Sequence, residues 1–193
     1  MQQLSKDFTL EEFLYSETTQ RYPNIAALQK KPPTSVVDCL SYLATTSLQK
    51  IADTFDFPIT VSSGYRCLQL NRLVGSSDTS QHVLGQAADI SIPNSFLSDA
   101  QSTNLRTTIN TAVKTMIGKT IGHDANANYY LFVFCALHLN DLDIDQLICE
   151  YGEIGQPAWV HVSASKSTNR RQILLINHDG TKLLTLKQAI GLV

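Results

Sequence analysis

The pattern of apolar and polar positions changes character along the chain. Up to about residue 140, apolar residues recur mostly at the helical period, most clearly between positions 35 and 55. Beyond that point, short runs with alternating apolar and polar faces dominate. The pattern predicts helices over 8–14, 35–55, 68–73, 97–117, 129–139 and 186–191. It predicts strands over 59–63, 86–92, 144–150, 158–164, 171–176 and 182–186. The strongly apolar run 129–139 is compatible with a buried helix or a strand, and we favour the helix.

Local signals support several of these elements. Thr9 and Glu12 have the spacing of a capping box at a helix start, and Phe8 and Phe13 can pack across it. The sequence His-Asp-Gly-Thr at 178–181 separates two β-like runs and is typical of a hairpin turn. We therefore expect the last two strands to pair with each other.

Three polar stretches, 24–33, 75–80 and 118–128, are expected to be connecting segments. Helices followed by strands are typical of an α+β fold. The fold expected is a small antiparallel sheet with helices on one side. At 193 residues, the chain has the length of one domain, here 1–193 with a core from Phe8 to about Leu186.

Ionisable residues gather on one face of the predicted sheet. In a strand, alternate side chains point to opposite faces. Asp89, His161 and Glu150 each lie opposite the apolar face of their own strand, so neighbouring strands would bring them together. His82 lies seven residues before Asp89, and Gly85 would let the intervening loop turn tightly enough for His82 to reach back.

Two histidines and one carboxylate are the donor set of a catalytic zinc site that keeps its fourth position for water. Zinc lowers the pKa of such a water to about 7. A separate carboxylate must then move protons, and Glu150 is the first candidate and Glu153 the second. Arg66 follows a strand end and can stabilise an oxyanion or hold a substrate carboxylate.

Each of these residues also has an ordinary interpretation when taken alone. A strand carboxylate, a loop histidine or a single arginine is more often a solvated surface group than part of a site. Only the combination points to chemistry. His123, His138 and His178 are assigned no function, because they fall in a loop, an apolar helix and a hairpin turn.

Three motifs resemble a known family. They are Ser-Gly-Tyr-Arg at 63–66, Ser-Gln-His-x-x-Gly-x-Ala-x-Asp at 80–89, and Trp-Val-His-Val-Ser at 159–163. In this order and spacing they resemble the zinc D-Ala-D-Ala carboxypeptidase family, peptidase M15, in the compact branch common among phage and bacterial wall hydrolases. The likeness runs from Phe8 to the C-terminal hairpin and is weakest over 118–139.

The resemblance implies a fold shared with the hedgehog signalling domain. It implies one Zn²⁺ per chain, held by His82, Asp89 and His161, and hydrolysis of a peptide bond in peptidoglycan stem peptides or cross-links. The residues expected to bind substrate are Arg66, Ser80 and Trp159, and Arg66 would also stabilise the transition state.

The chain departs from the family pattern at one position. Many members carry the catalytic carboxylate three residues before the last zinc histidine, where this chain has Ala158. Glu150, in Gln-Leu-Ile-x-Glu at 146–150, can supply it from the adjoining strand. If neither Glu150 nor Glu153 reaches the metal, the chain would be an inactive zinc-containing binding module on the same fold. A cytoplasmic D-Ala-D-Ala dipeptidase is a further alternative.

The composition of the chain excludes some classes of binding partner. Fifteen basic and seventeen acidic residues give a net charge of −2, which provides no positive field for nucleic acid or anionic lipid. No apolar run approaches the roughly 20 residues that span a membrane. The first residues lack the apolar core of a signal peptide. We therefore expect a monomer, made in the cytoplasm, that acts on the cell wall after release or export by another route.

The sequence does not identify the peptide bond that is cleaved. D-Ala-D-Ala, L-Ala-D-Glu and the bond from D-Ala to a cross-bridge are all compatible with the motifs. The shape of the pocket decides among them, and we expect that shape to depend on residues 118–139.

Overall fold

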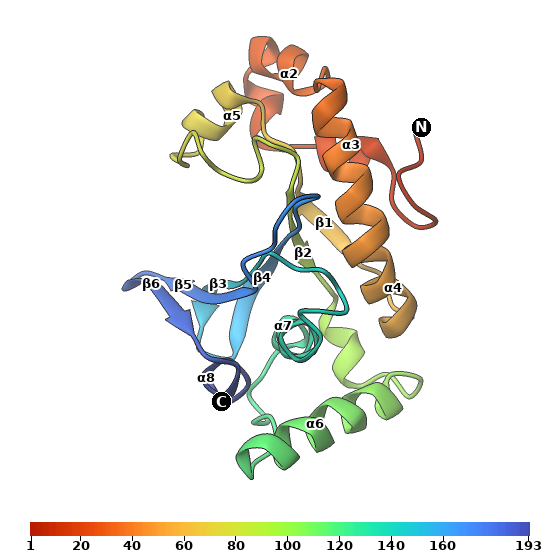
Figure 1. Cartoon of the computed structure of the whole chain (residues 1–193), viewed down its shortest axis with the longest axis vertical. Coiled ribbons are helices and arrows are strands. Elements are labelled where there is room, and N and C mark those ends of the chain that lie inside the picture. The colour runs from red at the N-terminus through yellow and green to blue at the C-terminus, as the bar shows by residue number, and fades with distance from the viewer.

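The computed structural model describes residues 1–193 and contains one mixed β-sheet (Figure 1). Its strands are β1 (Thr60–Ser63), β2 (Ala87–Ser91), β3 (Gln146–Glu153), β4 (Gln156–Ser163), β5 (Gln172–Asn177) and β6 (Gly180–Leu184). They lie in the order β1-β2-β4-β3-β5-β6. All six strands overlap the predicted ones, and the α+β class is confirmed.

The sequence pattern suggested a purely antiparallel sheet, and this expectation was wrong. β3 and β5 pair in parallel. β4 ends beside the start of β3, where Asp145 N–H donates to the Ser163 carbonyl. The chain then passes this end of β3 and returns on its other side, so that Gln172 lies opposite Gln146. β5 therefore begins where β3 begins and runs in the same direction. The other four strand pairs are antiparallel.

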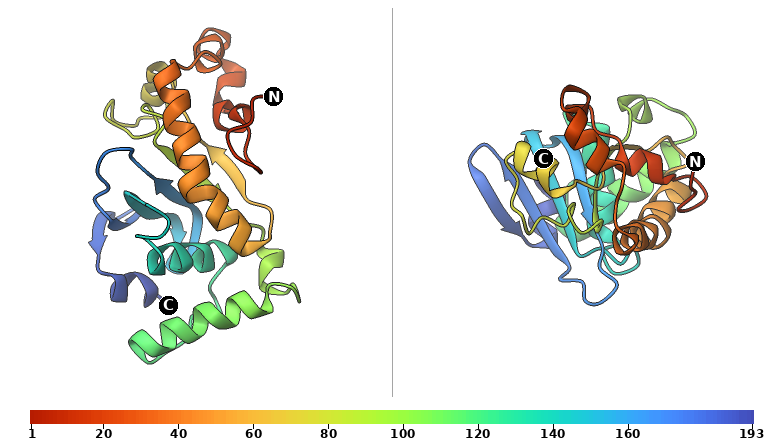
Figure 2. Two further views of the ribbon diagram at one scale, coloured as in Figure 1. Left: turned by 45° about the vertical axis from the view of Figure 1, so that its right-hand side comes forward. Right: turned by 90° about the horizontal axis from the view of Figure 1, so that it is seen from above.

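The helices are α1 (Leu10–Leu14), α2 (Pro23–Gln29), α3 (Thr34–Leu43), α4 (Gln49–Phe55), α5 (Leu68–Leu73), α6 (Thr103–Ile117), α7 (Ala127–Leu137) and α8 (Leu186–Ile190). A π-helical turn, Ala44–Leu48, joins α3 and α4 into one long rod (Figure 2). The capping box of Thr9 and Glu12 is present at α1. None of the helices is both long and apolar enough to cross a bilayer.

Two helix predictions need correction. Residues 24–33 were expected to connect elements, but α2 begins at Pro23, a residue well suited to the first helical position because it has no N–H to satisfy. The helix expected from 97 begins only at Thr103. Asp99 accepts hydrogen bonds from the N–H and the hydroxyl of Ser102 just before it, which fixes a turn there instead.

α7 forms the hydrophobic floor of the sheet. It packs against β3 and β4, and α6 lies on the side of α7 away from the sheet (Figure 1). Within α7, the buried Asn128 accepts from the N–H of Ile92 after β2 and donates to the carbonyls of Pro157 and Ala158 on β4. The segment that the sequence left unexplained therefore builds the layer beneath the site and fixes two of its strands.

Candidate metal centre and cleft

Strand pairing places two of the expected ligands side by side. Asp89 on β2 lies directly opposite His161 on β4, so both side chains share the face of the sheet that points away from α7. Their neighbours on the other face, such as Ile90 and Val160, belong to the hydrophobic core. Strand alternation therefore positions Asp89 and His161 as predicted from the sequence.

The loop before β2 carries His82 back over these strands. Gly85 has a φ of +68°, and a Cβ there would lie 2.6 Å from the Val36 carbonyl oxygen of α3, so the close contact requires glycine. The Nδ1 of His82 lies 2.6 Å from the Gly64 carbonyl oxygen. Because a carbonyl only accepts, Nδ1 carries the proton and Nε2 presents its lone pair.

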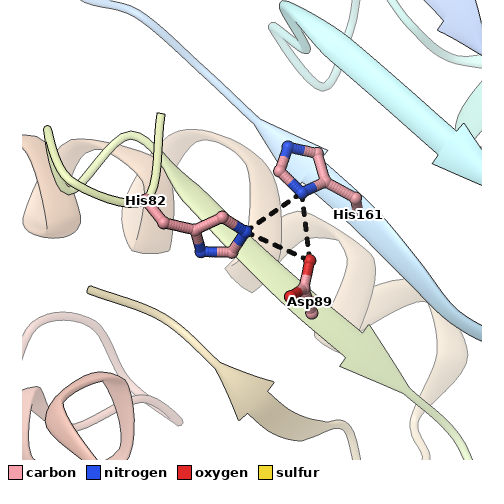
Figure 3. A group of neighbouring side chains, drawn as sticks. All are labelled: His82, Asp89 and His161. Carbon is pink, nitrogen blue, oxygen red and sulfur yellow. Dashed lines mark hydrogen bonds and ion pairs between the residues drawn. The ribbon is translucent and has the colours of Figure 1, made fainter. Parts of the chain in front are cut away.

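Three donor atoms converge on one point (Figure 3). His82 Nε2 lies 3.3 Å from Asp89 Oδ1 and 3.2 Å from His161 Nδ1, and His161 Nδ1 lies 3.0 Å from Asp89 Oδ1. A tetrahedral zinc site with bonds of about 2.0–2.1 Å has ligand–ligand edges of about 3.3 Å. The three side chains are buried. Their spacing and donor types therefore fit a metal ion, and no other such group occurs in the chain.

Arg66 supports this group through its carboxylate. Its Nη2 donates to Asp89 Oδ2 at 3.0 Å, and its Nε donates to Ser63 Oγ at 2.9 Å. Asp89 Oδ2 is thereby occupied, which leaves Oδ1 facing the two imidazoles. Burial by itself would raise the pKa of Asp89, but the charges and hydrogen bonds of His82 and His161 hold it far below its usual range.

Glu150 stands beside the group on the adjoining strand. It lies opposite Trp159, whose indole Nε1–H donates to Glu150 Oε2 at 2.6 Å. Burial raises the pKa of Glu150, and so does the charge of Asp89. His161, the indole N–H and Arg66 offset part of this increase. Glu150 is therefore a carboxylate with an unusual tendency to hold a proton next to the candidate metal centre.

Neither Glu153 nor position 158, where many family members carry the catalytic carboxylate, reaches the site. Glu153 is exposed and pairs with Gln156 at the end of the β3–β4 hairpin, outside the cleft. Ala158 lies on the face of β4 opposite to His161, because the two positions differ by an odd number of residues. A side chain there would point away from the candidate ligands unless the strand were irregular.

The three candidate ligands, Arg66 and Glu150 line a cleft of about 850 Å³ on the face of the sheet that points away from α7. One side is polar and includes Ser62, Ser63, Arg66 and the loop from Val74 to His82, with Ser80 among them. The lining residues on the other side come from β3, β4, β5 and the segment just before β5, and they include the apolar and aromatic side chains of Ile148, Tyr151, Trp159 and Ile176 together with Gln146, Glu150 and Arg170. We call this the aromatic side. None of residues 118–139 lines the cleft. The expectation that they shape the pocket was wrong, because they form the layer beneath the sheet instead.

Sequence reasoning missed the residues that hold the polar side in place. Buried Gln29 donates to the Leu14 and Tyr65 carbonyls and accepts from the Cys67 N–H, which fixes the backbone on both sides of Arg66. Buried Asn71 donates to the Ser76 and Ser77 carbonyls in the loop that walls the cleft. Neither residue carries a sequence signal, because a buried amide can be recognised only when its partners are known.

The three histidines that were assigned no function lie away from the candidate ligands. His123 is almost fully exposed beside Asp124, and His138 follows α7 close to Asp141. His178 occupies the β5–β6 turn. His123 and His178 occupy the loop and the turn that were expected, whereas His138 lies just after α7 and not within the helix.

Comparison with known proteins identifies the family. The sequence model described as peptidase M15 matches residues 6–123. No match was found among the curated proteins. The matched span contains Arg66, His82 and Asp89, and strand pairing brings His161 and Glu150 to them from beyond it. Together with the buried His/Asp/His group, this match indicates a metallopeptidase. The chain belongs to the peptidase M15 family.

Proposed function

We propose that the protein is a zinc-dependent peptidase that hydrolyses a peptide bond in the stem peptides or cross-links of peptidoglycan. The observation that carries this proposal is the convergence of His82 Nε2, Asp89 Oδ1 and His161 Nδ1 at the bottom of an open cleft, with Glu150 beside them. One metal ion per chain would be held by these three atoms. When bound, zinc would supply Lewis acidity and lower the pKa of a coordinated water to about 7.

Glu150 is the proposed general base. Its carboxylate takes a proton from the attacking water and returns it to the leaving amine, which requires a pKa closer to neutrality than that of an exposed glutamate. The raised pKa of Glu150 has the sign that this role needs. Trp159 acts as a positioning residue, because its indole N–H holds Oε2 and leaves Oε1 free for the proton.

Arg66 has two proposed roles. It orients Asp89 by binding Oδ2, and its guanidinium places a positive charge in the cleft, where a carboxylate or a developing oxyanion of the substrate can bind. Ser80 lines the same side and offers a hydroxyl for hydrogen bonds to the peptide. These assignments make the polar side of the cleft the binding surface for charged and polar groups of the substrate.

The size of the cleft favours a long substrate over a free dipeptide. Cavities of about 300–1,000 Å³ suit ligands of drug size or larger, and this cleft lies in the upper part of that range. An inactive binding module is less well supported, because Glu150 lines the cleft and provides a carboxylate there, which position 158 lacks.

The test is digestion of purified peptidoglycan by the zinc-loaded protein, with Glu150→Gln as the matched inactive variant. We expect new amino groups with the wild type, and mass spectrometry of the products identifies the bond. Free D-Ala-D-Ala is the comparison substrate. Cleavage of the dipeptide alone would support the dipeptidase, and bound zinc without turnover of any substrate would support the inactive module.

A further inference from the structure

Two aromatic rings, those of Trp159 and Tyr151, line the second side of the cleft, and the ring of His178 extends this row just beyond the lining residues. The Trp159 and Tyr151 rings have centroids 5.3 Å apart at 53°, and the Tyr151 and His178 centroids are 6.2 Å apart at 54°. The wall begins at Glu150, which Trp159 contacts, and extends to the β5–β6 turn that carries His178. We call these three residues the aromatic wall. It is a direct continuation of the candidate catalytic site.

Tyr151 reaches this wall only through an unusual backbone conformation. Strand alternation would place its side chain on the α7 face with Cys149, opposite to Glu150. Instead, Tyr151 has a φ of +51°, and Gly152 follows with a φ of +79°. The left-handed region is unfavourable for a bulky side chain such as tyrosine. The backbone therefore holds a strained conformation at a position where the ring contributes nothing to the core.

The ring of Tyr151 is available to a ligand. The residue is 42% exposed, and its ring lines the cleft together with Trp159 and Ile176. Strain of this kind persists at binding and catalytic sites, where it positions a group for use. The exposed Tyr151 ring lies beside Trp159 and His178 and is accessible to a ligand in the cleft.

The shape and chemistry of the wall favour one kind of ligand. Its rings lie side by side and Tyr151 is exposed, which suits a flat ligand with apolar C–H faces whose polar groups stay in water. An apolar amino-acid side chain would instead gain most from an enclosed pocket. We propose, resting on the proposed action on peptidoglycan, that the aromatic wall binds a sugar ring of the glycan strand to which the cleaved peptide is attached.

A binding experiment tests this without any requirement for turnover. Trp159 is the only tryptophan in the chain, so its fluorescence reports on the wall directly. The probe is chitotetraose, a soluble chain of N-acetylglucosamine. The variants are Tyr151→Phe, which keeps the ring, and Tyr151→Gly, which removes the ring and suits the left-handed backbone. Asp56→Gly makes the same backbone change at φ +46°, at the exposed end of α4.

We expect a saturable fluorescence change for the wild type, Tyr151→Phe and Asp56→Gly, and at least about 10-fold weaker binding for Tyr151→Gly, the factor that corresponds to loss of one good stacking contact. Absence of a saturable change in the wild type would overturn the proposal. Equal affinity in Tyr151→Gly would do so as well, because the ring would then make no contact with the sugar.

A second experiment separates sugar from peptide. It compares kcat/KM for a disaccharide-bearing stem peptide and for the same peptide without the sugar. We expect the sugar to raise kcat/KM in the wild type and the advantage to fall to about one in Tyr151→Gly. An equal fall for both substrates would assign the wall to the peptide. If neither substrate is cleaved, the proposed function fails, while the chitotetraose titration still decides whether the wall binds sugar.

Discussion

The two sides of the cleft are built in different ways. On the polar side the functional groups are anchored by the protein itself: Arg66 binds Asp89, His82 binds the Gly64 carbonyl, and buried amides hold the surrounding loops. On the aromatic side, Trp159 contacts Glu150 and Tyr151, and both aromatic residues line the cleft. The first arrangement suits a fixed metal centre, and the second suits groups that meet a substrate.

The two sides of the cleft also come from different parts of the sequence. The polar side comes from residues 62–89, within the span that matches the peptidase M15 family, whereas Glu150, Tyr151 and Trp159 lie beyond that span. The first region supplies two of the three candidate metal ligands, His82 and Asp89, and the arginine that orients Asp89. The β3–β4 hairpin supplies the third ligand, His161. We infer that the hairpin also sets the proton transfer and much of the contact with the substrate. Substitutions on the two sides should therefore have different consequences.

The largest effect is expected on the aromatic side, from Glu150→Gln. The variant keeps the shape of the side chain and a hydrogen-bond acceptor for Trp159 but loses the proton-accepting carboxylate. We expect kcat to fall by at least about 100-fold, the lower end for a general base, with the metal content unchanged. Steady-state kinetics and metal analysis on the same sample measure both. Glu153→Gln is the matched control, and equal loss in that variant would contradict the assignment.

The next effect is expected on the polar side, from Arg66→Ala. This change leaves Asp89 Oδ2 buried without its partner, so Asp89 is no longer held in the orientation that a metal needs. Loss of a group that orients a ligand typically weakens metal binding by about 10–100-fold. Competition with a chelator measures the affinity. Arg72→Ala, which removes an exposed pair with Asp78, is the control and should leave affinity unchanged.

A smaller effect is expected from Trp159→Phe, which removes the indole N–H. Hydrogen bonds to charged groups contribute about 1.5–3 kcal/mol, so partial loss of this contact in the transition state should lower kcat by about 10-fold. KM for a peptide without sugar should change less than kcat, and the metal should be retained. A fall in metal content in place of kcat would show that Trp159 serves the metal centre instead.

The smallest effect concerns stability. Because the folded pKa of Glu150 lies above its unfolded value, the metal-free folded chain binds more protons between the two values, and stability falls as the pH rises through that window. Glu150→Gln removes this loss. We expect the metal-free variant to melt a few degrees above the wild type at pH 7, with the difference vanishing near pH 4, where glutamate is largely protonated in both states.

Strand periodicity was sufficient to predict which strand residues share one face of the sheet. Asp89, His161 and Glu150 could be placed on one face because alternation within a strand is fixed by backbone geometry. The ion pair of Arg66 with Asp89 could not be predicted, since it depends on how a loop closes over a strand. The position of the Tyr151 side chain could not be predicted either, because its left-handed backbone breaks the alternation of side chains along the strand.

The helical layer shows a second limit of the sequence. The apolar run of α7 indicated a helix, but its role depended on Asn128, whose three hydrogen bonds connect α7 to the ends of β2 and β4. The parallel pairing of β5 with β3 was likewise invisible, because local patterns do not determine on which side of a sheet the chain returns.

The central claim is that His82, Asp89 and His161 hold one zinc ion. The most direct test is metal content per chain in protein purified without added metal, measured beside His161→Ala and Glu150→Gln. We expect close to one zinc per chain in the wild type and in Glu150→Gln, and loss of the zinc in His161→Ala. A wild-type protein that binds no metal, even after zinc is supplied, would contradict the assignment of these three residues as zinc ligands.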